Sequence, residues 1–166
     1  MGAALQELVA PESALDLVSL ARMGHSAEAN AQKGRASPTD TATSALGGCV
    51  VVSGTSLAGT NHIFDATLET PEGSRNWSIS RVDIPEIEDV WLVLGFTGIG
   101  SPTGEMVAGV SELLKSDPIK MKEIEAIGQI THSGLRALSS GNMEGVGQAM
   151  NECQERLRKI GVSSPE

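Results

Sequence analysis

The spacing of apolar residues in the first third of the chain predicts two helices. Residues 11–30 open with a proline and carry apolar side chains three residues apart, which is the period of one helix face. The apolar positions of that face are Leu15, Val18 and Ala21. A shorter helix is expected over residues 39–46, because Gly47 and Gly48 follow and favour its end.

The middle of the chain shows the alternation and the apolar runs of strands. The run CVVVSG from residue 49 predicts a brief buried strand, and IFDATLET and NWSISRV alternate as half-exposed strands do. The run VWLVLGF over residues 90–96 is apolar throughout and predicts a strand buried on both faces. The acidic stretch DIPEIED before it is typical of a linker, so a domain boundary is expected near residue 84.

The last third of the chain has helical periodicity. One predicted helix carries on one face Met106, Val107, Val110, Leu113 and Leu114. Asp117-Pro118 predicts the start of the next helix, which runs to about residue 139, and Asn142 is expected to cap a third. The apolar stripe of that third helix is Met143, Val146, Met150, Cys153, Leu157 and Ile160. We expect this stripe to be core, with Cys153 as a small buried hydrophobe.

Composition limits the functions that the chain can have. Its 166 residues suffice for one ordinary domain or two small ones. A net charge of −9 and an aromatic content of 2% argue against a nucleic-acid partner. Cys49 and Cys153 are too few for a disulfide scaffold, so two reduced thiols are expected. The N-terminus lacks a signal-peptide pattern and no window has 18 consecutive apolar residues, so we expect a cytoplasmic protein without a membrane partner.

One acid, Asp40, lies among small hydroxyl residues in GRASPTDTATSALGG, residues 34–48. The pattern fits a helix start with Ser37 as the N-cap, Pro38 at the first helical position and Asp40 at the third. The negative charge of Asp40 would then suit the positive end of the helix dipole. The local pattern favours this capping role, and it leaves open a second role in which Asp40 accepts a proton.

Two other candidate sites are weaker. The glycine-rich stretch GFTGIGSPTGE, residues 95–105, lacks the Lys-Ser/Thr of a P-loop and the Gly-x-Gly-x-x-Gly spacing, so a plain strand-to-helix turn is favoured over a ligand loop. His25 and Glu28 are three residues apart and would share a helix face, which suits either a metal pair or, more simply, a solvated surface. No Ser/His/Asp arrangement has the spacing of a nucleophile elbow.

The order of these pieces is informative. The segment ARMGHSAEANAQKGRASPTDTATSALGGCVVVS resembles the middle of archaeal-type mevalonate kinases, members of the GHMP superfamily of small-molecule kinases. In these a helix with Gly-His and a glutamate leads to a small-residue loop, then Ser-Pro-Thr-Asp-Thr, Gly-Gly and a strand. The resemblance continues in VLGFTGIGSPTGEMVAGVSELL and SGNMEGVGQAMNECQERLRKIGVSS, and is weakest over residues 54–88. It implies an α+β fold, with the end of the family's N-terminal domain over residues 1–84 and the start of its C-terminal domain over residues 85–166.

The resemblance also implies roles for individual residues. Asp40 matches the family's catalytic aspartate beside the acceptor hydroxyl, where a carboxylate can orient the alcohol and accept its proton. Glu28 matches the magnesium-binding glutamate, and Thr43, one turn after Asp40, would line the substrate pocket. The implied cofactors are ATP and Mg²⁺. The implied reaction is transfer of the ATP γ-phosphoryl group to the 5-hydroxyl of mevalonate, in isoprenoid biosynthesis.

The chain departs from the family pattern in several places. It carries one extra residue between Glu28 and Gly34, and Gly104 stands where relatives often have Lys. Cys153 and Arg156 replace an asparagine and an apolar residue. The family's ATP loop would precede residue 3, and its second glycine loop would follow residue 166. The resemblance therefore implies a central fragment that is inactive on its own, because the triphosphate cradle is missing.

Two alternatives stay open. The first is another GHMP kinase whose acceptor is phosphomevalonate or a different small alcohol. A phosphorylated acceptor would need extra cations near Asp40, and Lys33 and Arg35 are close in sequence. The second is a non-catalytic fragment that binds a partner or itself through newly exposed apolar surface, for example as a homodimer.

Overall fold

The structure is a computed structural model and describes residues 16–70, 73–87, 89–95, 98, 100 and 103–163. The chain divides into two compact units, residues 1–83 and residues 84–166. The fold is mixed α+β, with one small three-stranded sheet. The predicted opening of the first helix, at Pro11 and Leu15, lies outside the described residues.

The first unit begins with two helices. Helix α2 (Leu17–Ala31) starts where Asp16 Oδ1 accepts the backbone N–H groups of Val18 at 3.1 Å and Ser19 at 3.2 Å. A hydrogen bond from the Ser19 hydroxyl, together with these N–H groups, lowers the pKa of the Asp16 carboxyl below its ordinary value.

Helix α3 (Thr39–Leu46) has the predicted bounds, and the glycines that follow it have the predicted role. Gly47 and Gly48 adopt left-handed backbone conformations, with φ of 66° and 71°. Glycine occupies this region without strain, so the chain can leave the helix and enter a strand at once.

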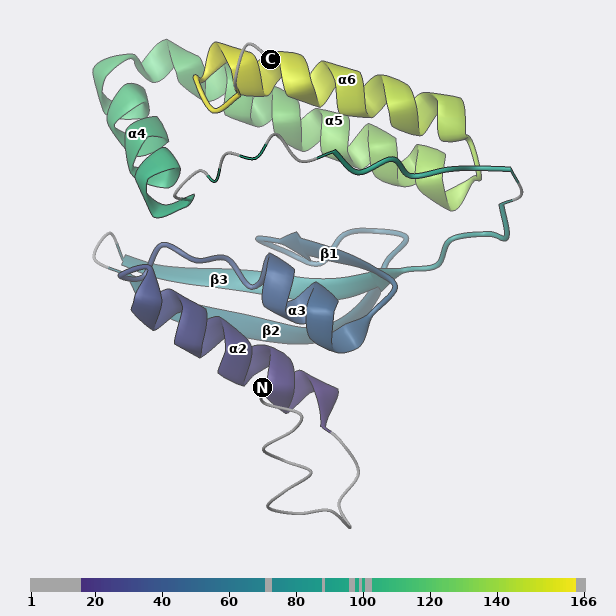
Figure 1. Cartoon of the computed structure of the whole chain (residues 1–166), viewed down its shortest axis with the longest axis horizontal. Coiled ribbons are helices and arrows are strands. Elements are labelled where there is room, and N and C mark those ends of the chain that lie inside the picture. The colour runs from purple at the N-terminus through teal and green to yellow at the C-terminus, as the bar shows by residue number, and fades with distance from the viewer. Residues whose placement is uncertain are drawn as a thin grey trace. The chain divides into compact units, whose positions relative to one another are not determined.

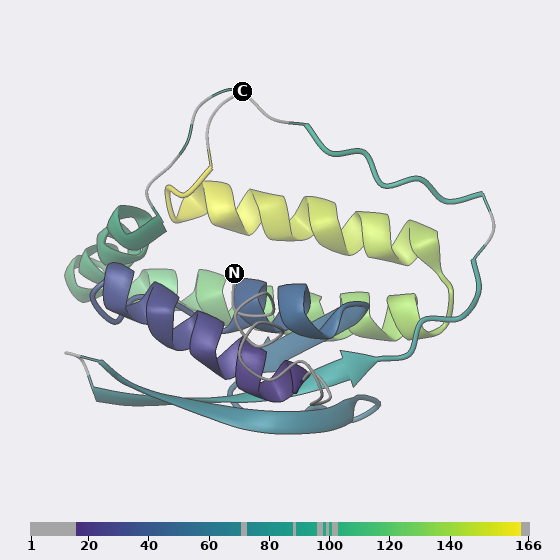
Figure 2. The same cartoon turned by 60° about the horizontal axis from the view of Figure 1, so that its bottom comes forward.

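Three strands follow, as predicted, and the structure pairs them antiparallel. They are β1 (Cys49–Ser53), β2 (Asn61–Thr70) and β3 (Gly73–Val82), in the spatial order β1-β3-β2. The central strand β3 pairs on both sides, and a bulge interrupts its pairing with β2 between His62 and Phe64. Strand β1 is half-buried along its length, not fully buried as its apolar run predicts. Helices α2 and α3 both cover the same face of the sheet (Figures 1 and 2).

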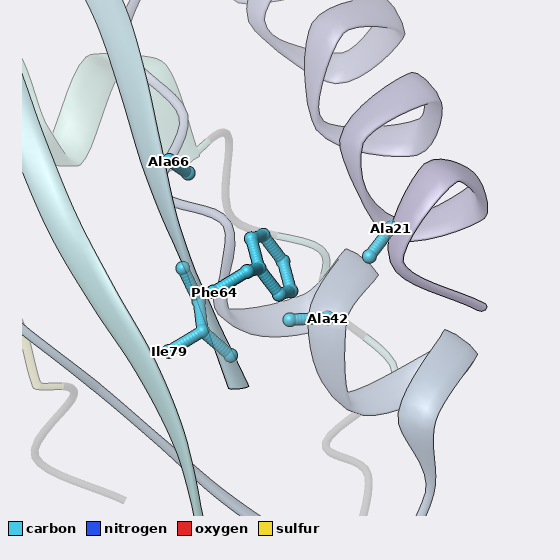
Figure 3. Close-up of a cluster of buried hydrophobic side chains, with 5 residues drawn as sticks. All are labelled: Ala21, Ala42, Phe64, Ala66 and Ile79. Atoms are coloured by element: carbon cyan, nitrogen blue, oxygen red, sulfur yellow. The ribbon is translucent and has the colours of Figure 1, made fainter. Parts of the chain in front are cut away.

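The core of the first unit lies between that sheet face and the two helices (Figure 3). Its buried members are Ala21 from α2, Ala42 from α3, Phe64 and Ala66 from β2, and Ile79 from β3. The Phe64 ring fills the space toward the two helices, and the three alanines present only methyl groups. Small side chains let helix and sheet backbones approach closely, so this core fixes where α2 and α3 lie.

The second unit is helical in its described part. Its elements are α4 (Thr103–Ser116), the 3-10 helix η1 (Pro118–Lys120), α5 (Met121–Ser139) and α6 (Met143–Lys159). Asp117 Oδ1 accepts the N–H of Ile119 at 3.3 Å, and Asn142 Oδ1 accepts that of Gly145 at 3.0 Å, so both predicted caps are confirmed. Helices α5 and α6 lie side by side (Figures 1 and 2).

An ion pair connects α5 with α6. Glu123 Oε2 lies 2.9 Å from Arg156 Nη1 and 3.8 Å from Lys159 Nζ. The Arg156 hydrogen bond, with the positive charge of Lys159, lowers the pKa of the Glu123 carboxyl below its ordinary value. The Arg156 that departs from the family pattern therefore has a packing role between these helices.

The predicted apolar stripe of α6 is not core. No described residue of α4, α5 or α6 is buried; Cys153 is half-buried and Met150 is exposed. Ile160, just after α6, is the one member of the stripe that is buried. Helices α5 and α6 cover one face of each other, and the described part of this unit contains no sheet to cover the rest.

The predicted strand over residues 90–96 is wrong for its described residues. Residues 90–95 pair with no other strand, and the five large apolar side chains from Val90 to Leu94 are 51% to 89% exposed. The segment runs as an extended trace (Figure 1). An apolar run becomes a buried strand only when a neighbouring strand bonds its backbone, and no described strand does so here.

The structure also bears on the expectations drawn from composition. Cys49 and Cys153 are both free thiols, and burial raises the pKa of the Cys49 thiol. Within the described residues, every helix is too short or too polar to cross a bilayer.

Candidate active site

Hydrogen bonds fix the turn between α2 and α3, residues 32–38, onto α2. The N–H of Gly34, whose φ is 80°, donates to the Ala29 carbonyl at 2.8 Å. His25 Nε2 lies 3.3 Å from the Ala36 carbonyl, and since a carbonyl only accepts, this nitrogen carries the proton. His25 is 5% exposed and meets the Trp77 ring edge to face at 5.4 Å.

These contacts correct the solvated-surface interpretation of His25. The imidazole is a buried brace for the turn that leads to Asp40. Because His25 Nε2 donates its hydrogen bond to the Ala36 carbonyl, this nitrogen is not free to bind a metal together with Glu28.

A second contact brings α2 against the start of α3. A Cβ atom at Gly24 would lie only 3.2 Å from Thr41 Cγ2, so Thr41 packs directly against α2 at Gly24. Glu28 follows Gly24 by four residues and therefore shares its face of α2. Asp40 directly precedes Thr41. Gly24 of α2 therefore lies against the first turn of α3, and Glu28 lies on the next turn of α2.

Asp40 is the second residue of α3, and it is exposed. The described residues offer its carboxylate no hydrogen bond. The predicted N-cap is wrong: Pro38 precedes the helix and its carbonyl accepts the Ala42 N–H at 2.8 Å. The Ser37 hydroxyl instead pairs with the Thr39 hydroxyl at 3.0 Å. Pro38, with φ −75° and ψ 9°, is itself the N-cap, so the cap lies one residue later than the capping pattern predicts, while the helix keeps its expected start at Thr39.

Thr43 lies one turn after Asp40 on the same side of α3 and is exposed. Its hydroxyl donates to the Thr39 carbonyl at 2.8 Å. The hydroxyl proton is therefore used within the helix, and Thr43 offers a ligand only lone pairs and a methyl group. Its place in a substrate pocket stays a prediction.

Glu28 pairs with a residue that the sequence analysis missed. Glu28 Oε1 accepts a hydrogen bond from Gln32 Nε2 at 2.9 Å. The other two oxygens of the pair, Glu28 Oε2 and Gln32 Oε1, are buried and have no hydrogen-bond partner. Such an acceptor without a donor costs about 1–3 kcal/mol. The four-residue spacing of Glu28 and Gln32 near a helix end is the signal that predicts their contact.

The donor chemistry of this pair fits Mg²⁺. Mg²⁺ prefers oxygen ligands, and proteins commonly hold it through one or two carboxylates together with substrate phosphates and water. Within the described residues, no group of three or more His, Cys, Asp or Glu side chains is arranged to hold a metal. A cation at Glu28 would therefore take most of its other ligands from outside these side chains.

A separate polar cluster lies on the first unit's sheet. His62 Nδ1 lies 3.0 Å from Ser78 Oγ, and His62 Nε2 lies 3.7 Å from Asp65 Oδ2, beside a cavity of about 500 Å³. These are the groups of a hydrolytic triad, yet Ser78 is 4% exposed and sits in a strand paired on both sides. Its neighbouring N–H groups bond within the sheet, so none is directed at an oxyanion.

Comparison with known proteins adds one relative. The chain is 31% identical over 147 residues to the mevalonate kinase of Methanothermobacter thermautotrophicus. The match covers 88% of this chain and 40% of the relative, so the chain spans less than half the length of that protein. No family model and no solved structure matches the chain. The chain is thus a distant relative of a mevalonate kinase.

Proposed function

We propose that this chain is part of an ATP-dependent small-molecule kinase of the GHMP type, with Asp40 as its catalytic residue. The observation that carries the proposal is the exposed Asp40 carboxylate on the first turn of α3, in a segment whose turn is fixed onto α2. The similarity to a mevalonate kinase supports mevalonate as the acceptor and its 5-hydroxyl as the group that receives the γ-phosphoryl.

The chemistry required of this chain is limited. Phosphoryl transfer depends mainly on holding the acceptor in line and on neutralising charge. The Asp40 carboxylate orients the acceptor hydroxyl and takes its proton as the new oxygen–phosphorus bond forms. Because no described side chain donates a hydrogen bond to the Asp40 carboxylate, the carboxylate is available to the acceptor hydroxyl. Thr43, one turn further on, accepts a hydrogen bond from another polar group of the acceptor.

Glu28 is the residue of this chain that holds Mg²⁺. When bound, the ion neutralises charge on the nucleotide phosphates. The half-buried Glu28 carboxylate keeps one oxygen unpartnered. Glu28 lies one helical turn after Gly24, and Gly24 lies against Thr41, the residue that follows Asp40. In this proposal Asp40 takes the proton and Glu28 holds the cation, so the two acids have separate tasks.

A phosphorylated acceptor is the second candidate. Lys33 and Arg35 are both exposed on the turn that leads into α3, and cations near the acceptor would favour a phosphate group. Phosphomevalonate kinase activity is therefore the reaction to measure beside mevalonate kinase activity.

The deciding experiment is an assay of ADP release. The matched region of the Methanothermobacter mevalonate kinase is replaced by this chain, and the chimera is given ATP, Mg²⁺ and either mevalonate or phosphomevalonate. We expect turnover with mevalonate that Asp40→Asn lowers by a factor of about 10²–10⁴. Asp65→Asn, an exposed acid of β2 in the same unit, is the matched control and leaves turnover unchanged.

Each result has a defined meaning. Turnover that survives Asp40→Asn would refute the catalytic assignment, and a preference for phosphomevalonate would select the second candidate. The chain alone is assayed in parallel, and we expect no turnover from it. A chimera that folds, binds ATP and yet transfers phosphate to neither acceptor would contradict the proposed function.

A further inference from the structure

We infer that Gln32 is a second oxygen ligand of the divalent cation held by Glu28. This inference rests on the proposed function, because it concerns the same cation. It adds a residue that the family pattern described above does not include.

The starting observation is the pair of unpartnered oxygens. The Gln32 side chain turns its NH₂ group toward Glu28 Oε1 at 2.9 Å, which fixes its carbonyl oxygen on the other side of the amide. That oxygen and Glu28 Oε2 are each buried without a donor. A single positively charged group bound between the two side chains would satisfy both acceptors.

The position of the pair on α2 favours a cation further. Gln32 is the C-cap of α2, and Glu28 lies in its last turn. The last carbonyl groups of a helix carry partial negative charge, and the last turn of α2 contains no basic residue. A carboxylate at this end is unfavourable unless a positive charge compensates it. The helix end, the carboxylate and the amide oxygen therefore all favour the same kind of ligand.

Two other groups could satisfy these oxygens. The ammonium group of Lys33, the next residue, is one; it is exposed and bonds to neither oxygen. A water molecule is the other, since it can donate two hydrogen bonds. A hard divalent cation differs from both because it is taken up from solution in proportion to its concentration, and because an added carboxylate strengthens its binding.

The test uses Mn²⁺ as a paramagnetic substitute for Mg²⁺. Loss of the free Mn²⁺ signal in electron paramagnetic resonance measures binding to the intact chain, and excess Mg²⁺ should restore the signal. We expect Gln32→Met, which keeps the length but removes the oxygen, to weaken binding by about tenfold or more. Gln32→Glu should strengthen binding by a similar factor, because ligand charge raises affinity. Glu28→Gln should abolish it.

Asn30→Met is the matched control, since Asn30 is an exposed amide residue of the same helix. We expect it to bind Mn²⁺ as the unaltered chain does. Circular dichroism of each variant confirms that α2 is folded. The opposite effects of the two Gln32 variants separate ligation from a general loss of structure, because damage weakens binding in both.

Two results would overturn the inference. One is an unaltered chain that takes up no Mn²⁺, which would leave Lys33 or water as the occupant. The other is Mn²⁺ uptake that depends on Glu28 but is equal in both Gln32 variants. The two experiments can fail independently. If the chimera transfers no phosphoryl group but Mn²⁺ binds as expected, the cation site stands and the proposed kinase function is refuted.

Discussion

Replacing Gly24 with alanine tests the close approach of α2 and α3, on which the placement of Asp40 depends. Alanine in a helix interior is favoured over glycine by about 1 kcal/mol. The added methyl group would lie 3.2 Å from Thr41 Cγ2 and 3.3 Å from Thr41 Cβ, closer than the usual carbon contact of about 3.5–4.0 Å. The Thr41 side chain cannot easily rotate away, because it is β-branched and its hydroxyl donates to the Pro38 carbonyl at 3.3 Å.

Overpacking of this kind costs roughly 1–3 kcal/mol, so we expect Gly24→Ala to lower the free energy of unfolding by between about 0 and 2 kcal/mol. Thr41→Ser removes the closest carbon atom. In that background the same change should be less harmful by about 1 kcal/mol, which is a coupling that a double-mutant cycle can resolve. Gly128→Ala, a glycine of α5 with open space around it, controls for helix propensity and should stabilise its own helix.

Urea unfolding measures these effects, followed by tryptophan fluorescence for the first unit and by circular dichroism for the Gly128→Ala control in α5. Trp91 is 89% exposed and uninformative, so Trp91→Phe leaves Trp77, packed against the core beside His25, as the reporter of the first unit. If Gly24→Ala stabilises the chain equally with and without the Thr41→Ser change, then α2 and α3 do not approach as described. The placement of α2, which carries Glu28, against the start of α3 would then lose its support.

Two further predictions concern the second unit. Leu92→Lys places a charge in the exposed apolar segment, and it should reduce any concentration-dependent growth in particle size in light scattering. Ile119→Lys, at an exposed apolar residue outside that segment, should not. The lowered pKa of Glu123 means that its pairing with Arg156 stabilises the unit above the usual carboxylate range and is lost as the pH falls through the lowered value. Glu123→Gln should therefore reduce the loss of stability between pH 7 and pH 3 in urea unfolding, and an unchanged loss would contradict this role.

The sequence was most informative where local chemistry decides the structure. Helix α3 could be predicted because glycines end it, and the caps at Asp117 and Asn142 because a side chain and a nearby N–H group suffice. The N-cap at Ser37 failed by a single residue, since the near-helical angles of Pro38 let its own carbonyl accept the first helix bond. Such a choice depends on backbone angles that residue types do not specify.

Predictions that depend on distant partners were less successful. The apolar run from Val90 has the composition of a buried strand, but composition does not supply the neighbouring strand that burial requires. His25 looked like half of a surface pair, because its acceptor, Ala36, is eleven residues away across a turn. Gln32 was passed over for a different reason: its spacing from Glu28 was visible, but the two unpartnered oxygens are a fact of burial.

The three alanines in the core of the first unit limit which substitutions this protein can accept during evolution. Ala21, Ala42 and Ala66 lose no side-chain rotamer freedom on folding, so this part of the core is ordered at little entropic cost. Except for glycine, every replacement at these positions adds volume and moves a helix away from the sheet. Substitutions in this core therefore tend to increase its side-chain volume and seldom reduce it. Because α2 carries Glu28 and α3 carries Asp40, the two acids are displaced whenever the core expands, and selection on the site acts on the core as well.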